Sequence, residues 1–573
     1  MTVESRRSVA GGGADVGDRT GALDLLLTDA ALGSSRRFFP GASGLRFAGA
    51  LARRPRWLAG RVAGLAAELG RIVIGTSDVA PSRRDRRFAD PAWTQNPLLR
   101  RVVQAYVVTG NTAEGLVEDV PLGRRDTERI SFVTSNLVEA LAPSNNPLLS
   151  PVAWKAAIDS GGGSVVAGTG HLVRDIASPP RVPSMVPPDA FEVGVDLGLT
   201  PGGVVLRTPV FELIQYRPQT PFVRSTPLLV VPPTINKYYI LDIAPGRSMV
   251  EYLVRQGHQV FVVSWRNPDA RHGRWGADTY CQAILDASAT ARDIAGTDAL
   301  HLMGACSGGI LASMALAHLA QIGQQHRIAG VTLLVTLLDQ APAGTAGAVV
   351  DETTAEAAVA VSRARGYLDG RTLAEAFAWL RPGDLIWNYW VNNYLEGKRP
   401  PAFDLLYWNA DTTRMTARLH RDFVRIAMRN ALTRPGGAAI LGTDIDLAKV
   451  TVDSYVVAGI ADHICPWQSC YRSTQLLGGR SRFVLSTNGH IAALVNPPSN
   501  PKSSYQTTAD DAGNPPDPRD WLEVAKTEQG SWWPDFSAWL ADRSGAEKLA
   551  PDGLGSTRFN ELGSAPGSYV LDR

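Results

Sequence analysis

Residues Gly304–Gly308 set a cysteine among small neighbours in the pattern Gly-Ala-Cys-Ser-Gly, and this pentad constrains the fold more than any other stretch. An apolar run, Ala299–Met303, precedes it, and a helical apolar pattern, Ile310–Leu316, follows it. A nucleophile elbow needs a strand, a sharp turn and a helix in that order, with small residues where the backbone is strained. The pentad therefore predicts an α/β-hydrolase fold with Cys306 as the nucleophile, where an esterase would carry serine. A buried structural cysteine is the alternative.

Candidates for the other two members of a catalytic triad follow the nucleophile in the order that this fold requires. A buried strand is predicted at Tyr455–Gly459, and Asp462 lies in the loop behind it. A second strand is predicted at Arg482–Ser486, and His490 follows it. We therefore predict Asp462 as the acid and His490 as the base. His463 is the alternative base, but its place beside the acid favours a packing role.

Composition narrows the class of protein. A chain of 573 residues with 45% hydrophobic and 20% charged residues is long enough for two or three globular domains. The net charge is +2 and the arginines are interspersed with acidic residues, so no nucleic-acid partner is expected. No apolar run approaches the roughly eighteen residues of a membrane span, and the N-terminal residues lack a signal-peptide pattern. We expect a protein that is neither secreted nor membrane-spanning.

The cysteines predict neither disulfides nor a metal site. The chain has four of them, which is too few for a disulfide framework and fits a reducing cytoplasm. Cys465 and Cys470 lack a second pair of ligands at zinc spacing, so we expect no metal. The glycine-rich stretch Gly161–Gly170 lacks the spacing of a dinucleotide-binding loop. No cofactor is therefore expected.

The composition of successive segments predicts the domain organisation. Residues 1–50 are rich in Gly, Ala, Ser and Arg with little periodicity, which favours a mobile tail. Residues 51–200 are expected to form a mainly helical N-terminal domain, beginning with an amphipathic helix at Trp57–Val73. Its apolar stripe fits packing on its own domain better than docking on a partner. Strand and helix patterns alternate over 201–573, which predicts the α/β catalytic domain.

One long interruption separates the predicted core strands. The next core strand after Asp339 is not expected until about Val452, and the segment at about 340–443 is helical in pattern and rich in tryptophan and tyrosine. Lids on α/β-hydrolase folds are inserted between core strands. We therefore predict an inserted helical cap over Cys306, with an aromatic lining suited to a greasy acyl substrate.

Several motifs together resemble one known family, the polyhydroxyalkanoate synthases. They are the stretches Val231–Asp242, Ser264–Pro268, Gly304–Gly309, Trp387–Trp390 and Asp462–Ile464. The resemblance extends from Asp85–Phe88 to Pro566–Val570, and the length is similar to that of the single-subunit synthases. The residues of Gly304–Gly309 and Phe377–Pro382 resemble those of the medium-chain-length (class II) group most. This resemblance does not fix the preferred monomer.

The resemblance implies an acyltransferase that polymerises (R)-3-hydroxyacyl-CoA into polyester and releases CoA. Cys306 as thiolate would form a covalent acyl-enzyme, which suits transfer because it and CoA are leaving groups of similar quality. His490 would move the protons and Asp462 would hold its imidazole. The backbone N–H groups of Ser307 and of Ile235, in the loop after an early strand, are the predicted oxyanion hole.

The resemblance also implies a homodimer that contacts the growing polyester and associates with polyhydroxyalkanoate granules in the cytoplasm. Two other functions fit the same fold. A thioesterase or polyester depolymerase would send water instead of a hydroxyl group into the acyl-enzyme. A non-catalytic protein of the polyester surface would be favoured only by a broken triad, and here all three members are present.

Overall fold

The computed structural model describes residues 30–31, 38, 40–340, 352–462, 464–509 and 513–573. These residues divide into two compact units. The first contains Phe191–Gly370 and Asp411–Arg573, and the second contains the described residues of Leu32–Ala190 together with Arg371–Ala410. The chain therefore leaves the first unit after Gly370 and returns to it at Asp411.

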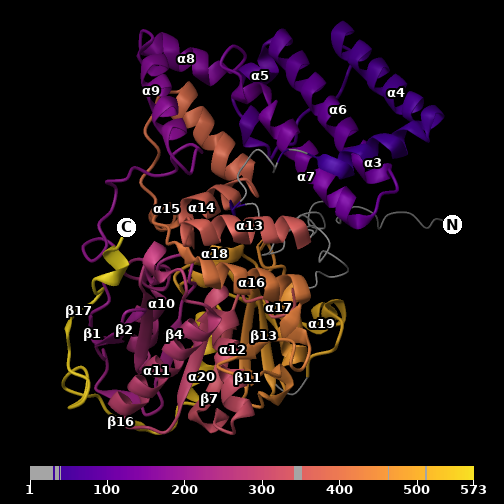
Figure 1. The fold of residues 1–573 in the computed structure, drawn as a ribbon. Coiled ribbons are helices and arrows are strands. Elements are labelled where there is room, and N and C mark those ends of the chain that lie inside the picture. Colours follow the sequence, from indigo (N-terminus) through magenta and orange to yellow (C-terminus); the bar gives the residue numbers. More distant parts are fainter. Residues whose placement is uncertain (1–29, 32–37, 39, 341–351, 463, 510–512) are drawn as a thin grey trace, which may run out of the picture. The chain divides into compact units, whose positions relative to one another are not determined.

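The first unit is built on a mixed sheet of eleven strands in the order β15-β14-β13-β12-β7-β6-β4-β5-β2-β1-β17 (Figure 1). In chain order its strands are β1 (Gly202–Arg207), β2 (Phe211–Tyr216), β4 (Leu228–Val231), β5 (Val260–Trp265), β6 (Leu300–Ala305), β7 (Ile328–Leu334), β12 (Ser454–Gly459), β13 (Ser481–Ser486), β14 (Ser504–Thr507), β15 (Lys526–Gln529) and β17 (Gly563–Ser564). Strand pairs β3 (Phe222–Arg224) with β16 (Glu547–Leu549), β8 (Tyr367–Leu368) with β9 (Met415–Thr416), and β10 (Ala439–Ile440) with β11 (Thr443–Asp444) are separate.

The six central strands, β5, β4, β6, β7, β12 and β13, are parallel. Every residue of β4, β5, β6 and β12 is buried, as expected for parallel strands covered on both faces. Parallel strands end at a common edge of the sheet, so the loops after β4, β6, β12 and β13 lie at one edge. This is where the fold can assemble a site.

Helices connect and cover these strands (Figure 1). They are α10 (Met249–Arg255), α11 (Ala277–Ala295), α12 (Ser307–Gln321), α13 (Glu352–Arg365), α16 (Ala417–Arg429), α17 (Trp467–Leu476), α18 (His490–Leu494), α19 (Pro518–Val524) and α20 (Trp533–Ala541). Local signals fix their ends: the Ser248 hydroxyl accepts from the Glu251 N–H to cap α10, and Gly296 ends α11 in the left-handed conformation. α12 is buried along almost its whole length, which fits its position behind β6.

The second unit is helical. Its helices are α3 (Gly41–Ala52), α4 (Pro55–Ile74), α5 (Ala92–Gln95), α6 (Pro97–Asp119), α7 (Arg124–Ala140), α8 (Pro151–Asp159), α9 (Gly163–Ala177) and α15 (Asp404–Ala410), joined by α14 (Gly370–Ala378) and two π-helical segments, Gly383–Trp387 and Trp390–Leu395. Within this unit Val182 and Met185 pack with Ala378 and Ile386. The segment 371–410 thus shares a core with the chain that follows α9.

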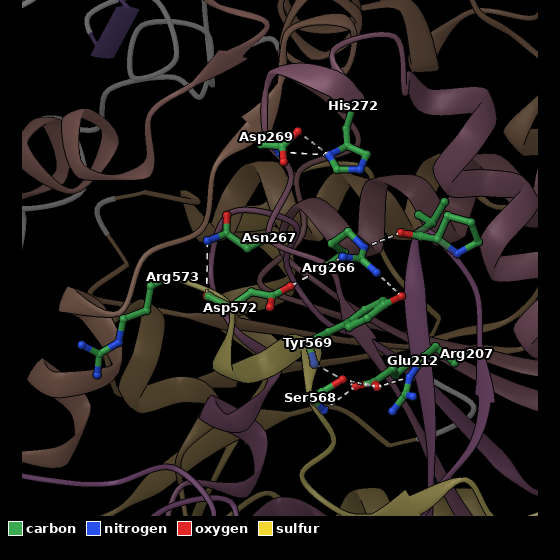
Figure 2. Close-up of polar contacts among 12 residues, drawn as sticks. Arg207, Glu212, Arg266, Asn267, Asp269, His272, Ser568, Tyr569, Asp572 and Arg573 are labelled. Carbon is green, nitrogen blue, oxygen red and sulfur yellow. Dashed lines mark hydrogen bonds and ion pairs between the residues drawn. The ribbon is translucent and has the colours of Figure 1, made fainter.

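The C-terminal segment is fastened to the first unit by a buried carboxylate (Figure 2). Glu212 in β2 accepts hydrogen bonds from the backbone N–H groups of Ser568 (2.8 Å) and Tyr569 (2.9 Å) and from the Ser568 hydroxyl (2.8 Å). Burial opposes its charge, but these donors and Arg207 lower its pKa overall. The Arg266 guanidinium lies 3.9 Å from the centre of the Tyr569 ring. These contacts therefore join the C-terminal residues of the first unit to strands that come early in its sequence.

The α/β-hydrolase fold predicted from the elbow is confirmed, including a helical N-terminal region. β7 ends at Leu334, because Val335 turns the chain with a φ of 43°. The predicted helix at Trp57–Val73 corresponds to α4. Most of the tail predicted at 1–50 lies outside the described residues, and α3 begins within the rest. No described helix is long and apolar enough to cross a membrane.

Candidate active site

Cys306 occupies the turn between β6 and α12 in a strained backbone conformation. Its φ is 51° and its ψ is −122°, a combination that non-glycine residues rarely adopt. The Cys306 N–H donates to the Leu334 carbonyl at 2.9 Å, which fixes the turn to the end of β7. This is the geometry of a nucleophile elbow, and it presents the cysteine at the N-terminus of a helix.

The glycines at the elbow are required because neighbouring atoms approach them closely. A Cβ added at Gly308 would lie 2.3 Å from the Pro232 carbonyl oxygen, and one at Gly309 would lie 2.0 Å from Thr336 Oγ1. A Cβ at Gly304 would lie 2.5 Å from the Cα of Gly309. The elbow therefore packs directly against the loop that follows β4, which sequence spacing alone could not show.

The predicted acid and base meet at the same edge of the sheet. Asp462 follows β12 and His490 begins α18 just after β13, and these two strands are parallel neighbours. Asp462 Oδ2 lies 2.7 Å from His490 Nδ1, and both side chains are buried. Asp462 Oδ1 accepts from the N–H groups of Ile464 (2.8 Å) and Cys465 (2.9 Å). The turn that follows Asp462 thus holds the carboxylate through Oδ1, while Oδ2 orients the imidazole. The alternative base, His463, lies outside the described residues.

Cys306 and His490 are electrostatically matched. A hydrogen bond with Cys465 contributes most to lowering the pKa of the Cys306 thiol; burial opposes it, while His490 and the Ser307 N–H lower it further. Burial disfavours the charged imidazole, but the charge and hydrogen bond of Asp462, with Cys306, raise the pKa of His490 to about 10. The position of the sulfur at the start of α12 adds the favourable helix dipole. Both shifts favour a thiolate–imidazolium pair.

Cys465 belongs to this site although the sequence did not predict it. Its sulfur, the Cys306 sulfur and a ring nitrogen of His490 all lie within 4.8 Å of one another, and all three residues are buried. Cys465 reaches the site because the Asp462 carboxylate turns the chain back three residues later. No spacing rule relates it to Cys306 in the sequence, so only the fold reveals the contact.

Three contacts hold the loop after β4. This loop carries Ile235, the predicted second oxyanion donor. The Thr234 N–H donates to the Ser307 hydroxyl at 3.0 Å, so the residue after the nucleophile also holds this loop. On the other side, the Thr413 N–H donates to the Ile235 carbonyl at 3.3 Å. Buried Lys237 pairs with Asp411 at 2.9 Å. The loop is therefore held in register with both the elbow and the chain segment that begins at Asp411.

Comparison with known proteins agrees with this architecture. A family model described as the poly-beta-hydroxybutyrate polymerase (PhaC) N-terminus matches residues 84–253, and the α/β hydrolase fold model matches residues 227–497. The chain is 47% identical to poly(3-hydroxyalkanoate) polymerase 2 of Ectopseudomonas oleovorans, over 91% of this chain and 92% of that one. It is 44% identical to polymerase 1 of the same organism, over 91% and 92%. It is 41% identical to the polymerase subunit PhaC of Cupriavidus necator, over 87% and 84%.

Proposed function

The chain belongs to the poly(3-hydroxyalkanoate) polymerase family, and we propose that it carries out this polymerisation through a covalent acyl-enzyme on Cys306. As a member it is an acyltransferase that polymerises hydroxyalkanoate units. The observation that carries the covalent route is the elbow thiol paired with an imidazole whose second nitrogen is held by Asp462 at 2.7 Å. The proposed substrate is (R)-3-hydroxyacyl-CoA, and the products are polyester and free CoA.

The first half-reaction loads the enzyme. The Cys306 thiolate attacks the thioester carbonyl, and the resulting oxyanion collapses to expel the CoA thiolate. His490 gives its proton to that leaving sulfur, so the step yields an acylated Cys306, neutral imidazole and CoA thiol. The two sulfurs are similar leaving groups, so the acyl group keeps the energy that it needs for a second transfer.

The second half-reaction forms the ester bond. The 3-hydroxyl group of another hydroxyacyl unit gives its proton to neutral His490 as it attacks the acyl-enzyme carbonyl. The C–S bond breaks, Cys306 leaves as thiolate, and the imidazolium is restored beside it. Asp462 favours this charged form and keeps Nδ1 protonated, which leaves the other ring nitrogen for proton transfer.

Backbone donors stabilise the oxyanion in both halves. We propose the Ser307 N–H as the first donor, because it follows the nucleophile and contributes to lowering the pKa of the Cys306 thiol. We propose the Ile235 N–H as the second donor, because the loop that carries it is fixed to the elbow through Thr234 and Ser307. Two fixed donors of this kind act where negative charge develops.

From the family resemblance we further propose a homodimer, located in the cytoplasm at polyester granules, with a helical cap within about 340–443. These are proposals about assembly, location and access to the site, and the chemistry above does not depend on them.

Incubation of the purified chain with (R)-3-hydroxyacyl-CoA tests the reaction. We expect release of CoA together with insoluble polyester, and a radiolabelled acyl group on wild-type protein that Cys306→Ala lacks. Release of CoA with soluble hydroxy acid would instead identify a hydrolase. A series of acyl chain lengths would identify the preferred monomer.

A further inference from the structure

Three soft ligand atoms converge in the candidate active site, and the proposed reaction uses only two of them. The sulfurs of Cys306 and Cys465 and a ring nitrogen of His490 lie within 4.8 Å of one another in a buried position. We propose that these three residues form a binding site for a thiophilic divalent cation such as Zn²⁺, and that its occupancy switches the polymerase off.

The donor set fits such a cation. Two thiolates and one imidazole, with a water or an added thiolate as the fourth ligand, form a common tetrahedral zinc environment. Bond lengths of about 2.3 Å to sulfur and about 2.0 Å to nitrogen place ligand atoms roughly 3.5–3.8 Å apart, so atoms that lie within 4.8 Å of one another need to approach by no more than roughly 1.3 Å. Magnesium and calcium prefer oxygen ligands, so the site selects soft metals.

The surroundings of His490 match those of a metal-binding histidine. Its Nδ1 is engaged by the Asp462 carboxylate at 2.7 Å, so Nε2 is the nitrogen available to a metal. A carboxylate behind a ligating histidine fixes the ring and makes it a better donor. The same contact that prepares the base for catalysis thus prepares it as a ligand.

Charge balance also favours binding. Two thiolates neutralise the two positive charges of the cation, which makes a buried complex affordable. Two protons leave on binding: one from the Cys465 thiol, and one from the proton shared by Cys306 and His490. No oxidant or reductant takes part. Occupancy should therefore weaken as the pH falls, because protons compete with the metal.

Cys465 distinguishes this site from a simple catalytic pair. Without it, Cys306 and His490 offer only two ligands. It is placed by the turn at Asp462, whose carboxylate accepts from the Cys465 N–H at 2.9 Å. Sequence spacing predicts no metal here, since the ligands come from three separate loops at the edge of the sheet.

Direct binding tests the site without reference to activity. Titration of the purified full chain with Co²⁺ should produce a thiolate-to-cobalt charge-transfer band at one equivalent, and Zn²⁺ should remove it. Cys465→Ala should lose the band and weaken binding by more than about 100-fold, and Asp462→Asn should weaken it by about 10 to 100-fold. Cys281→Ala is the matched control, because that buried cysteine in α11 lies outside the cluster. Absence of the band in the folded wild type, or its persistence in Cys465→Ala, would overturn the site.

The inhibitory consequence rests on the proposed function of Cys306 and is measured separately. Zn²⁺ should abolish CoA release by the wild type, a chelator should restore it, and Cys465→Ala should need far more Zn²⁺ for the same fractional loss of its own activity. If cobalt binds as expected but a saturated enzyme still releases CoA, the site stands and the covalent role of Cys306 fails. Inhibition equally strong in Cys465→Ala would show that the inhibitory metal binds elsewhere and would overturn the switch.

Discussion

Replacement of His490 by glutamine should raise the pH at which Cys306 becomes reactive toward iodoacetamide. In the wild type the pKa of the thiol is lowered by Cys465 first, against burial, and then by His490 and the Ser307 N–H. Only the thiolate reacts, so its alkylation rate follows its ionisation. Removal of the imidazolium removes one of the attractions that favour the thiolate, and the midpoint must move upward.

The size of the shift follows from the geometry. A His490 ring nitrogen and the Cys306 sulfur lie within 4.8 Å of each other. At 4.8 Å, the upper limit of that separation, and an effective dielectric constant of about 20, opposite charges attract by about 3.5 kcal/mol, and a shorter separation gives more. Since one pKa unit corresponds to about 1.4 kcal/mol, the alkylation midpoint should rise by about 2 pH units or more.

The assay is the rate of Cys306 alkylation as a function of pH, followed by mass spectrometry of the peptide that contains it. His318→Gln is the matched control, because His318 and His490 are each 8% exposed but His318 lies toward the far end of α12. Asp462→Asn should give a smaller upward shift, since it removes a charge that favours the imidazolium form of His490 but leaves the imidazole in place. A midpoint in folded His490→Gln that equals that of the control would refute the thiolate–imidazolium pair.

Three further outcomes are expected. Cys306→Ala should abolish CoA release with the melting temperature retained, and substantial remaining turnover would rule out this nucleophile. Gly308→Ala should lower the free energy of unfolding by roughly 3 to 5 kcal/mol in chemical denaturation, because its Cβ would meet a backbone carbonyl at 2.3 Å. Gly60→Ala is the control: it has open space around it and should raise the free energy of unfolding by up to about 1 kcal/mol. Burial, the largest cause in each case, lowers the pKa of His258 and of His301 from 6.5 to about 4. Each histidine therefore contributes about 3 kcal/mol to the free energy of unfolding. This contribution is present above pH 6.5 and is lost as the pH falls from 6.5 toward about 4. Stability that is flat across this range would contradict the buried neutral state.

The fold and the predicted triad positions could be read from the sequence because their signals are local. β6, the elbow and α12 are contiguous, and the apolar run and the glycines around Cys306 each have one structural meaning. The positions of Asp462 and His490 behind strands follow from chain order in this fold. Parallel pairing of β12 with β13 brings the loops after them to the same edge, where the two side chains lie 2.7 Å apart.

Other features have no local signal. β15 is exposed at every residue and lies at an edge of the sheet, so it carries no apolar pattern to detect. Cys465 approaches Cys306 only because a carboxylate turn redirects the chain, and Glu212 finds Ser568 only in the folded unit. The pairing of Lys237 with Asp411 likewise joins residues that are distant in sequence.

The contacts of Asp411 and Thr413 tie the loop after β4 to the point where the chain re-enters the first unit. One peptide bond separates Ala410, at the end of the segment 371–410, from Asp411, which holds Lys237, and Thr413 follows two residues later to hold Ile235. A shift of Asp411 or Thr413 would therefore move the backbone that we assign to oxyanion stabilisation. Substitutions at Asp411 or Thr413 are expected to change the turnover number through the position of the Ile235 backbone. A screen for altered monomer preference that scores rate alone would mistake such a change in oxyanion stabilisation for a change in substrate recognition.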